Sequence, residues 1–428
     1  MTAVVEPEIR QIEMGYLPGS PGYRRVLVAL FAAGMATFVL LYDTQALLPE
    51  FVDAFGISPA QSTLVMSVTT AALALALLVF GPLSEAVGRT RLIHFSLISS
   101  AVIALACAFA PSWDALLALR LLGGIALAGL PAVATAYLRE ELHPSTHARA
   151  AGLYIGGTAL GGMAGRLVTA PIAEAAGWRW ALVAAAGVAL ICAVIVALTL
   201  PASRNFVARP ARPRNILAMA RGALSDRALL ALYVIGACSV GALVAVFNAL
   251  GFRLTSSPFH LGVGVVSLVY LVYPLGTISS TVSGRLADRL GRRAIMPVGS
   301  ALALAGVGLT LSGWLPVVVA GVAVLTVGFF VTHGLASGWV AARAHASGAS
   351  TSQAASFYLF AYYVGSSVFG SLGAHAWTSA DWPGVVALTA ALVTVAGVLS
   401  LALRRIPVLG ASTIHESELK PLLHSRID

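Results

Sequence analysis

Two short stretches decide the fold: Gly81-Pro-Leu-Ser-Glu85-Ala-Val-Gly88-Arg89 and Gly284-Arg-Leu-Ala-Asp288-Arg-Leu-Gly291-Arg292. Each follows a long apolar run, and in each a glycine, an acid, a second glycine and an arginine recur at the same spacing. The four positions of the second stretch all lie 203 residues after their counterparts in the first. One such turn is a weak signal, but two copies in register after matching segments indicate an internal duplication.

The apolar runs around these stretches indicate that most of the chain lies in a lipid bilayer. Of the 428 residues 58% are hydrophobic and only 10% are charged, with a mean hydropathy of +0.89, whereas about a quarter of the residues in a soluble domain are charged. About 20 apolar residues span a bilayer as a helix, and a β-barrel would need shorter alternating segments. We therefore predict an all-α integral membrane protein with twelve transmembrane helices in two pseudo-symmetric six-helix halves. The predicted spans lie near 26–48, 62–82, 91–110, 114–137, 150–171, 179–200, 228–250, 261–283, 294–313, 316–340, 354–376 and 383–403.

The arginines predict the orientation of this bundle. With the N-terminus inside, 22 of the 26 lysine and arginine residues fall in cytoplasmic segments, and only Arg179 and Arg253 fall outside. The positive-inside rule therefore predicts that both termini are cytoplasmic. We divide the chain into an N-terminal tail (1–22), an N-terminal half (23–200), a linker (201–226), a C-terminal half (227–405) and a C-terminal tail (406–428). The basic linker is expected to be solvated and to touch anionic lipid headgroups, without a nucleic-acid partner.

Taken together, these motifs resemble the major facilitator superfamily over essentially the whole chain. The two duplicated stretches are similar to its signature loop between helices 2 and 3 and the copy between helices 8 and 9, with Glu85 where aspartate is usual. Arg120-Leu-Leu-Gly123-Gly124 resembles its helix-4 pattern associated with proton coupling, and Gly157-Thr158-Ala-Leu-Gly161-Gly162 resembles its antiporter motif, with Thr158 in place of proline. Gly161 to Arg166 and Phe357 to Tyr363 are similar to the bacterial YnfM-like branch, described as arabinose-efflux or drug-antiporter proteins. The resemblance implies a location in the inner or plasma membrane of a bacterium.

Each duplicated loop suggests a conformational gate. Its first glycine (Gly81, Gly284) would permit close helix contact, and its acid (Glu85, Asp288) would face the positive end of a neighbouring helix. The Gly-Arg turn (Gly88-Arg89, Gly291-Arg292) would anchor charge at the membrane interface.

Three charged side chains are predicted inside the bilayer at a shared depth. Asp43, Arg120 and Arg166 each lie about 8 to 10 Å below the outer end of a span, and an intramembrane charge costs roughly 3 kcal/mol or more unless it is paired or wet. We expect Asp43 to pair with Arg120, with Arg166 or with both. The pair is either a structural lock or a proton-coupling site, and the surplus arginine would suit a substrate that bears a carboxylate or phosphate. His333 in span ten is a second titratable candidate, although a lone histidine among small residues is more often a packing residue.

Several uncharged polar side chains are candidates for the wall of a transport pathway, although helix packing explains them equally well. They are Gln45, Asn248, Tyr270, Tyr273, Tyr358 and Tyr362.

No enzyme or ATP-driven pump is indicated, because the sequence contains no phosphate-binding loop and no nucleophile elbow. No metal or cofactor is expected, since Pro144 and Ser145 interrupt the only spaced histidine pair, His143 and His147. The leading hypothesis is a monomeric secondary transporter that exports a small organic compound or drug in exchange for protons. The alternative is an importer or facilitator of a sugar or organic anion. A receptor or lipid-modifying enzyme is disfavoured by the duplication.

Overall fold

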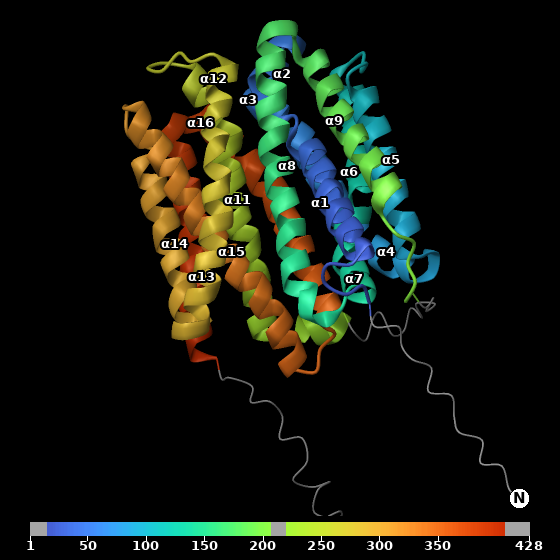
Figure 1. Cartoon of the computed structure of the whole chain (residues 1–428). Helices are drawn as coiled ribbons and strands as arrows, with labels where there is room; N and C mark the ends of the chain where they lie inside the picture. The colour runs from blue at the N-terminus through green and yellow to red at the C-terminus, as the bar shows by residue number, and fades with distance from the viewer. Residues whose placement is uncertain (1–14, 207–219, 407–428) are drawn as a thin grey trace, which may run out of the picture.

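The computed structural model describes residues 15–206 and 220–406. Most of the two predicted tails and part of the linker therefore lie outside the described residues, including Arg10, Arg209, Arg212, Arg214, Lys420 and Arg426. Within the described ranges the chain is a bundle of long helices that run roughly parallel to one another (Figure 1).

The N-terminal half crosses the bundle six times. Ser20 caps the first helix by accepting a hydrogen bond from the Tyr23 amide at 3.2 Å, and Pro21 occupies the first helical position, where its missing N–H costs nothing. The six crossings are α1 (Pro21–Tyr42) with η1 (Gln45–Leu47) and α2 (Leu48–Phe55); α3 (Pro59–Ser62) with α4 (Leu64–Val87); α5 (Arg89–Cys107); α6 (Trp113–Leu127) with α7 (Gly129–Glu141); α8 (His147–Ala176); and α9 (Trp178–Thr199).

The C-terminal half repeats this course. Its crossings are α11 (Arg227–Thr255); α12 (Val263–Ser267), η3 (Leu268–Val272) and α13 (Tyr273–Leu290); α14 (Arg292–Leu309); α15 (Leu315–Ala346); and the two arms of α16 (Thr351–Ala402). The arms of α16 meet at Asp381, whose φ of 51° is incompatible with a continuing helix. Nine helical stretches of the described chain are long and apolar enough to span a membrane. One of the nine, from Thr351 to Arg405, contains both arms, and α8 and α14 supply the remaining two of twelve crossings.

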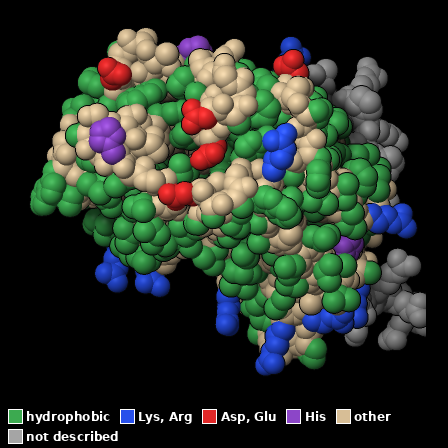
Figure 2. Space-filling model, turned by 90° about the horizontal axis from the view of Figure 1, so that it is seen from above, with side chains coloured by type: hydrophobic (Ala, Val, Ile, Leu, Met, Phe, Trp, Pro, Cys, Tyr) green, Lys and Arg blue, Asp and Glu red, His purple; other side chains and the backbone are tan. Residues whose placement is uncertain are grey.

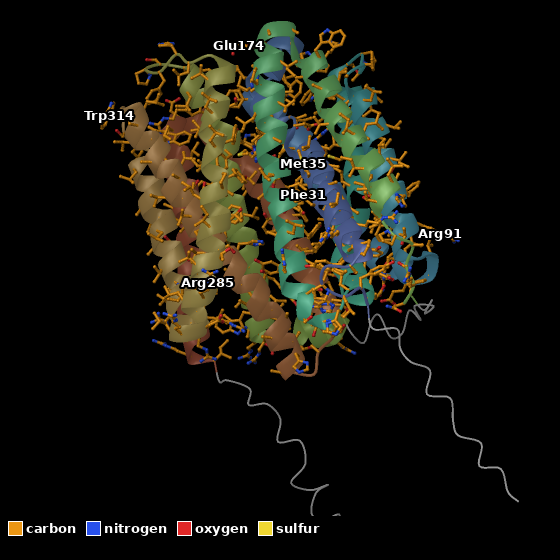
Figure 3. The ribbon with its side chains drawn as sticks, viewed as in Figure 1. Phe31, Met35, Arg91, Glu174, Arg285 and Trp314 are labelled. Carbon is orange, nitrogen blue, oxygen red and sulfur yellow. The ribbon has the colours of Figure 1, made fainter. Side chains whose placement is uncertain are left out.

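The two halves have separate hydrophobic cores. Most residues of one core lie in α1 to α9 and most residues of the other in α11 to α16, which agrees with the two-half architecture. We call the end of the bundle near the first and last described residues, Gly15 and Ile406, the terminal face, and the opposite end the distal face. Arg91 and Arg285 lie near the terminal face, and Glu174 and Trp314 near the distal face (Figure 3). Exposed acidic side chains are visible on the distal face (Figure 2).

Glycines bring α8 against α1 at backbone distance. A Cβ atom at Gly157, Gly161 or Gly165 would collide with the main chain of α1, and Phe31 and Met35 lie on that helix beside α8 (Figure 3). Small residues at this spacing permit such contact in a lipid environment, where van der Waals packing rather than the hydrophobic effect drives helix association. In this conformation, the glycines of the antiporter-like pattern therefore let α8 pack closely against α1.

The duplicated loops agree with the prediction in their turns. Gly88 has a φ of 101° and Gly291 a φ of 86°, and each separates the end of one helix from the start of the next. Because a residue with a Cβ atom rarely adopts this conformation, glycine is required at both positions.

The close helix contact expected at the first glycine of each loop is absent in this conformation. A Cβ atom added to Gly81 or Gly284 would meet no described atom within 4 Å. The carboxylates of Glu85 and Asp288 form no side-chain hydrogen bond or ion pair with another described residue. Instead, Arg89 pairs with Glu140 at the end of α7, with 3.0 Å between Nη2 and Oε1. The contact expected between each acid and a neighbouring helix end stays a prediction, and nothing in the sequence indicated that Glu140 is the partner of Arg89.

Candidate functional site

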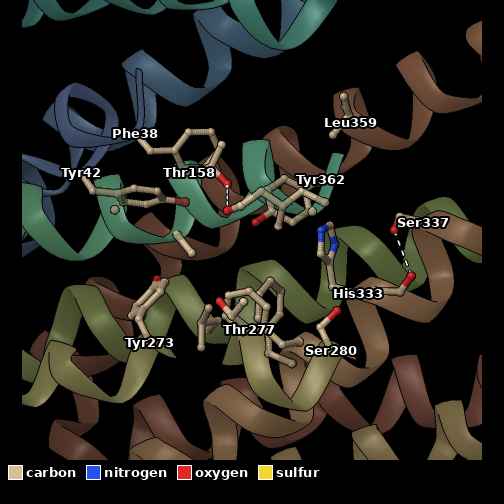
Figure 4. Close-up of a pocket in the computed structure, with 18 of the residues that line it drawn as sticks. Phe38, Tyr42, Thr158, Tyr273, Thr277, Ser280, His333, Ser337, Leu359 and Tyr362 are labelled. Carbon is tan, nitrogen blue, oxygen red and sulfur yellow. Dashed lines mark hydrogen bonds between the residues drawn. The ribbon is translucent and has the colours of Figure 1, made fainter. Parts of the chain in front are cut away.

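A cavity of about 300 Å³ lies between the two halves. It begins at the middle of the bundle, at Tyr42 and Tyr273, and extends toward the terminal face as far as Gly152 and Ser337. Its wall is largely aromatic and hydroxylated, and no lysine, arginine, aspartate or glutamate is among the described lining residues. Figure 4 shows the side chains of its two sides facing one another, including Phe38, Tyr42, Thr158, Tyr273, Thr277, Ser280, His333, Ser337, Leu359 and Tyr362.

His333 is held in the cavity wall by aromatic neighbours. Its Nδ1 atom lies 2.8 Å from the hydroxyl of Tyr358, and its ring stacks on Phe329 with 5.4 Å between ring centroids. Tyr362 lies across it at 4.9 Å and lines the cavity, whereas Tyr358 lies behind the histidine. Tyr358 and Tyr362, four residues apart on α16, thus both contact the imidazole.

Asp43 and Arg120 form a buried ion pair just beyond the distal end of α1. Arg120 Nη1 lies 2.9 Å from Asp43 Oδ1, and the two residues are only 4% and 1% exposed. Arg120 also donates to the carbonyl oxygen of Leu40 at 3.2 Å and to Thr69 Oγ1 at 3.1 Å. The second carboxylate oxygen of Asp43 is buried and has no hydrogen-bond partner among the described residues. One carboxylate oxygen therefore accepts a hydrogen bond from Arg120, and the other is buried without a hydrogen-bond partner among the described residues.

Arg166 lies directly behind the distal end of the cavity and is completely buried. Its Nε and Nη1 atoms donate to Gln45 Oε1 and to the Gly162 carbonyl oxygen, each at 2.6 Å, and Nη2 donates to the Tyr273 hydroxyl at 3.2 Å. The guanidinium lies over the rings of Tyr42, Tyr270 and Tyr273 at 4.2, 4.7 and 4.8 Å. No described carboxylate is within 4.0 Å of it. Of the pairings left open by the sequence, the structure therefore contains Asp43 with Arg120.

Gln45 and Asn248 join the two halves across their pseudo-symmetry axis. Gln45 Nε2 donates to Asn248 Oδ1 at 2.6 Å, and these residues are 203 positions apart, the offset of the duplicated loops. Asn248 also donates to the Gly370 carbonyl oxygen at 3.2 Å. Each residue is therefore the repeat counterpart of its partner, which is possible only at the axis.

The contacts between the halves close the distal side. Ser67 Oγ donates to the Ser367 carbonyl oxygen at 2.9 Å, Ser367 Oγ donates to the Ser67 carbonyl oxygen at 2.8 Å, and Glu174 accepts the Gly264 amide at 2.8 Å. Every hydrogen bond identified between described residues of opposite halves lies at the middle of the bundle or on its distal side. We call these contacts between the halves the seal. The cavity lies on the side of the seal that faces the terminal face.

The structure places some of the candidate pathway residues at this cavity and others behind it. Tyr273, Tyr362 and His333 line the cavity, while Gln45, Asn248, Tyr270 and Tyr358 form the layer behind it. The sequence reasoning missed several lining residues that lie inside apolar runs, where an aromatic or hydroxyl side chain has no distinguishing signal. These are Phe38, Tyr42, Thr158, Thr277, Ser280, Phe329, Phe330 and Tyr363.

Comparison with known proteins agrees with this architecture. The family profile of the Major Facilitator Superfamily matches residues 26–370. An uncharacterized MFS-type transporter YybF of Bacillus subtilis is 40% identical over 88% of this chain and 93% of its own length. The inner membrane transport protein YnfM of Escherichia coli is 39% identical over 90% of this chain and 92% of its own length.

A solved bacterial homologue of the human lysosomal transporter Spinster, in an inward-facing and occupied conformation, has the same fold. It superposes with a TM-score of 0.72 at 15% identity, covering 90% of this chain and 98% of that one. The chain therefore belongs to the major facilitator superfamily of membrane transporters.

Proposed function

We propose that this protein is a proton-coupled exporter of a small organic compound, with its terminal face in the cytoplasm. The observation that carries the proposal is the half-satisfied carboxylate of Asp43, buried beside Arg120 just beyond the end of α1. A proton on the open oxygen would break no hydrogen bond between described residues. It would, however, remove the negative charge that compensates Arg120.

Loss of the negative charge on Asp43 would change the contacts that Arg120 makes between helices. Arg120 also donates to the Leu40 main chain of α1 and to Thr69 of α4, so it connects three helices of the N-terminal half. Removing one partner of a buried ion pair costs about 3 to 5 kcal/mol, which is comparable to the free energies that separate conformational states. Protonation of Asp43 is therefore able to change which packing of the three helices is favoured.

The seal and the cavity fit alternating access. In the conformation described, the distal contacts are closed, and the cavity extends toward the terminal face, where the arginines predict cytoplasm. Opening the distal side would break the Gln45–Asn248 and Ser67–Ser367 contacts. We propose that Glu85 and Asp288 gain partners only in that second conformation, in which the cytoplasmic ends of the two halves approach each other.

Flux measurements in proteoliposomes or inverted membrane vesicles test the proposal. Candidate compounds are assayed with an imposed proton gradient, and again after the gradient is collapsed. Export that depends on the gradient in the wild-type protein and not in Asp43→Asn supports coupling through this carboxylate. Gradient-independent equilibration by both proteins would instead favour a facilitator, the alternative in which a sugar or organic anion moves down its own gradient.

A further inference from the structure

We infer that the transported compound is a small aromatic carboxylate that carries a single negative charge. This inference rests on the proposed function, because it names what the cavity between the halves receives. It follows from three features of the site: an uncompensated buried cation, a glycine in the wall between the cavity and that cation, and a ring-lined chamber of small volume.

The cation is Arg166. The three described intramembrane charges in this region are Asp43, Arg120 and Arg166, and the first two neutralise each other. Arg166 is fully buried and is surrounded by neutral acceptors and tyrosine rings, which attract a cation but do not neutralise it. The environment of the cavity therefore carries one net positive charge. Because Coulomb attraction strengthens in a medium of low dielectric constant, an anion in the cavity would feel this charge far more strongly than in water.

At position 162, glycine places no side chain between the cavity and Arg166. Gly162 lines the cavity, and its carbonyl oxygen accepts a hydrogen bond from Arg166 Nη1. A Cβ atom at this position would lie 3.6 Å from that nitrogen and 3.5 Å from the Tyr42 ring. A side chain here would therefore fill the space between the cavity and the guanidinium, and glycine leaves that space empty. Two of the five guanidinium hydrogens have no acceptor among the described residues. The rings of Tyr42 and Tyr273, which line the cavity, cover the guanidinium in this conformation, so a ligand oxygen would bind these hydrogens after one of the rings moves aside.

The rest of the cavity suits an aromatic ring. Phe329, Phe330, His333 and Tyr362 form one side of it, and Phe38 lies on the other half. Aromatic side chains favour stacked and edge-on contacts with a flat ring. The volume of about 300 Å³ is at the lower end of the range for small-molecule sites, which limits the compound to one or two rings.

The net charge distinguishes carboxylate from phosphate. A phosphate monoester carries about −1.5 to −2 charges at neutral pH and would leave uncompensated negative charge opposite one arginine. A carboxylate balances Arg166 with one charge and can accept two hydrogen bonds from its guanidinium. A cationic compound would be repelled by Arg166, whose charge no described carboxylate in the cavity wall offsets.

Competition binding to the purified full-length protein tests this inference. The probes are benzoate, benzamide and benzylamine, which share a ring and differ in charge. We expect benzoate to bind roughly ten- to a hundredfold more tightly than benzamide, and benzylamine to bind weakest. Arg166→Gln should remove the difference between benzoate and benzamide, and Arg166→Lys should largely restore it. Equal or tighter binding of benzamide or benzylamine by the wild-type protein would overturn the inference, as would binding of none of the three.

Gly162→Ala keeps the test decisive if Arg166→Gln does not fold. The added methyl group makes ordinary van der Waals contacts, so the variant should fold while occupying the space in front of Arg166. Benzoate binding should weaken several-fold and benzamide binding should change little. Gly156→Ala is the matched control, because a Cβ atom there meets no described atom within 4 Å. If Gly162→Ala binds benzoate like the wild type, the carboxylate is not placed at this position and the inference fails.

Net flux of radiolabelled benzoate in proteoliposomes, with and without an imposed proton gradient, separates the two proposals. Benzoate flux that is indifferent to the proton gradient would contradict proton coupling and support the substrate class. Proton-driven flux of a neutral or cationic compound, without benzoate binding, would support coupling and contradict the substrate class.

Discussion

Replacing Asp43 with asparagine is the sharpest test of the buried ion pair. The side chain keeps its shape and one acceptor oxygen but loses its charge. Arg120 would retain its bonds to Leu40 and Thr69 at 3.2 and 3.1 Å, both with neutral acceptors. Its bond to position 43, now 2.9 Å, would change from a charge-assisted hydrogen bond to one with a neutral amide oxygen.

The expected destabilisation follows from these contacts. Removing one partner of a buried ion pair costs about 3 to 5 kcal/mol, and the retained neutral hydrogen bond offsets about 1 kcal/mol of this. We therefore expect Asp43→Asn to lower the stability of the N-terminal half by about 2 to 4 kcal/mol. Thr69→Val is the matched control, since it removes a neutral partner of the same guanidinium and should cost about 1 kcal/mol.

Thermal unfolding of the purified proteins, measured beside proton-driven flux, gives the answer. If the pair couples protons to transport, Asp43→Asn loses gradient dependence and keeps passive exchange, while Thr69→Val keeps both. A purely structural pair predicts a loss of stability with gradient dependence retained in the surviving protein. A variant that is as stable as the wild type and transports at the same gradient-dependent rate would refute the reasoning and direct attention to His333.

Three further outcomes are expected. Gln45→Leu and Asn248→Leu should each favour the conformation with an open distal side, measured as faster labelling of cysteine reporters placed on that side. If the effects of the two substitutions on the labelling rate are additive in the double variant, the 2.6 Å bond between the two side chains does not couple the halves. Arg89→Gln, which removes the partly exposed pair with Glu140, should cost up to about 1 kcal/mol, whereas Arg292→Gln should leave the unfolding temperature unchanged. If the substrate is a monoanion, its charge alone should let an inside-negative potential of about 100 mV supply about 2.3 kcal/mol and raise its outward accumulation about fiftyfold beyond that of a neutral compound exchanged for the same number of protons. An equal response of both compounds to a potassium diffusion potential would contradict this.

Much of the fold could be predicted because it depends on periodic and repeated features. Apolar runs of about 20 residues, the loops at an offset of 203 and the glycine turns are all one-dimensional signals. The turns at Gly88 and Gly291 could be located from the sequence alone, since glycine is the residue that most readily adopts a positive φ between two helices.

The sequence identified Arg120 and Arg166 as the possible partners of Asp43 but could not decide between them. Counting residues along a helix gives the depth of Asp43, Arg120 and Arg166, but not the direction in which each points, because successive side chains turn by about 100°. The end of α1 at Tyr42 changes that direction for every later residue. Only the structure shows that the break turns Asp43 toward Arg120 and Gln45 toward Arg166.

The two halves share a scaffold and differ in chemistry, and this difference bears on how transport and coupling can be separated. The duplicated glycine turns and the Gln45–Asn248 pair obey the repeat. The intramembrane charges do not, since the positions 203 residues after Asp43, Arg120 and Arg166 are Val246, Ala323 and Phe369. Likewise, the counterparts of His333 and Tyr362 in the first half are Leu130 and Ala159.

The proposed proton site therefore lies within one half, while the ring-binding surface lies largely within the other. A bound aromatic anion would contact both, its carboxylate near Arg166 and its ring near His333 and Tyr362. Binding then ties the halves together, and protonation alters the packing of one of them. Because the two events act on different residues, substitutions in the aromatic wall should change affinity without changing gradient dependence. Substitutions at the ion pair should do the reverse.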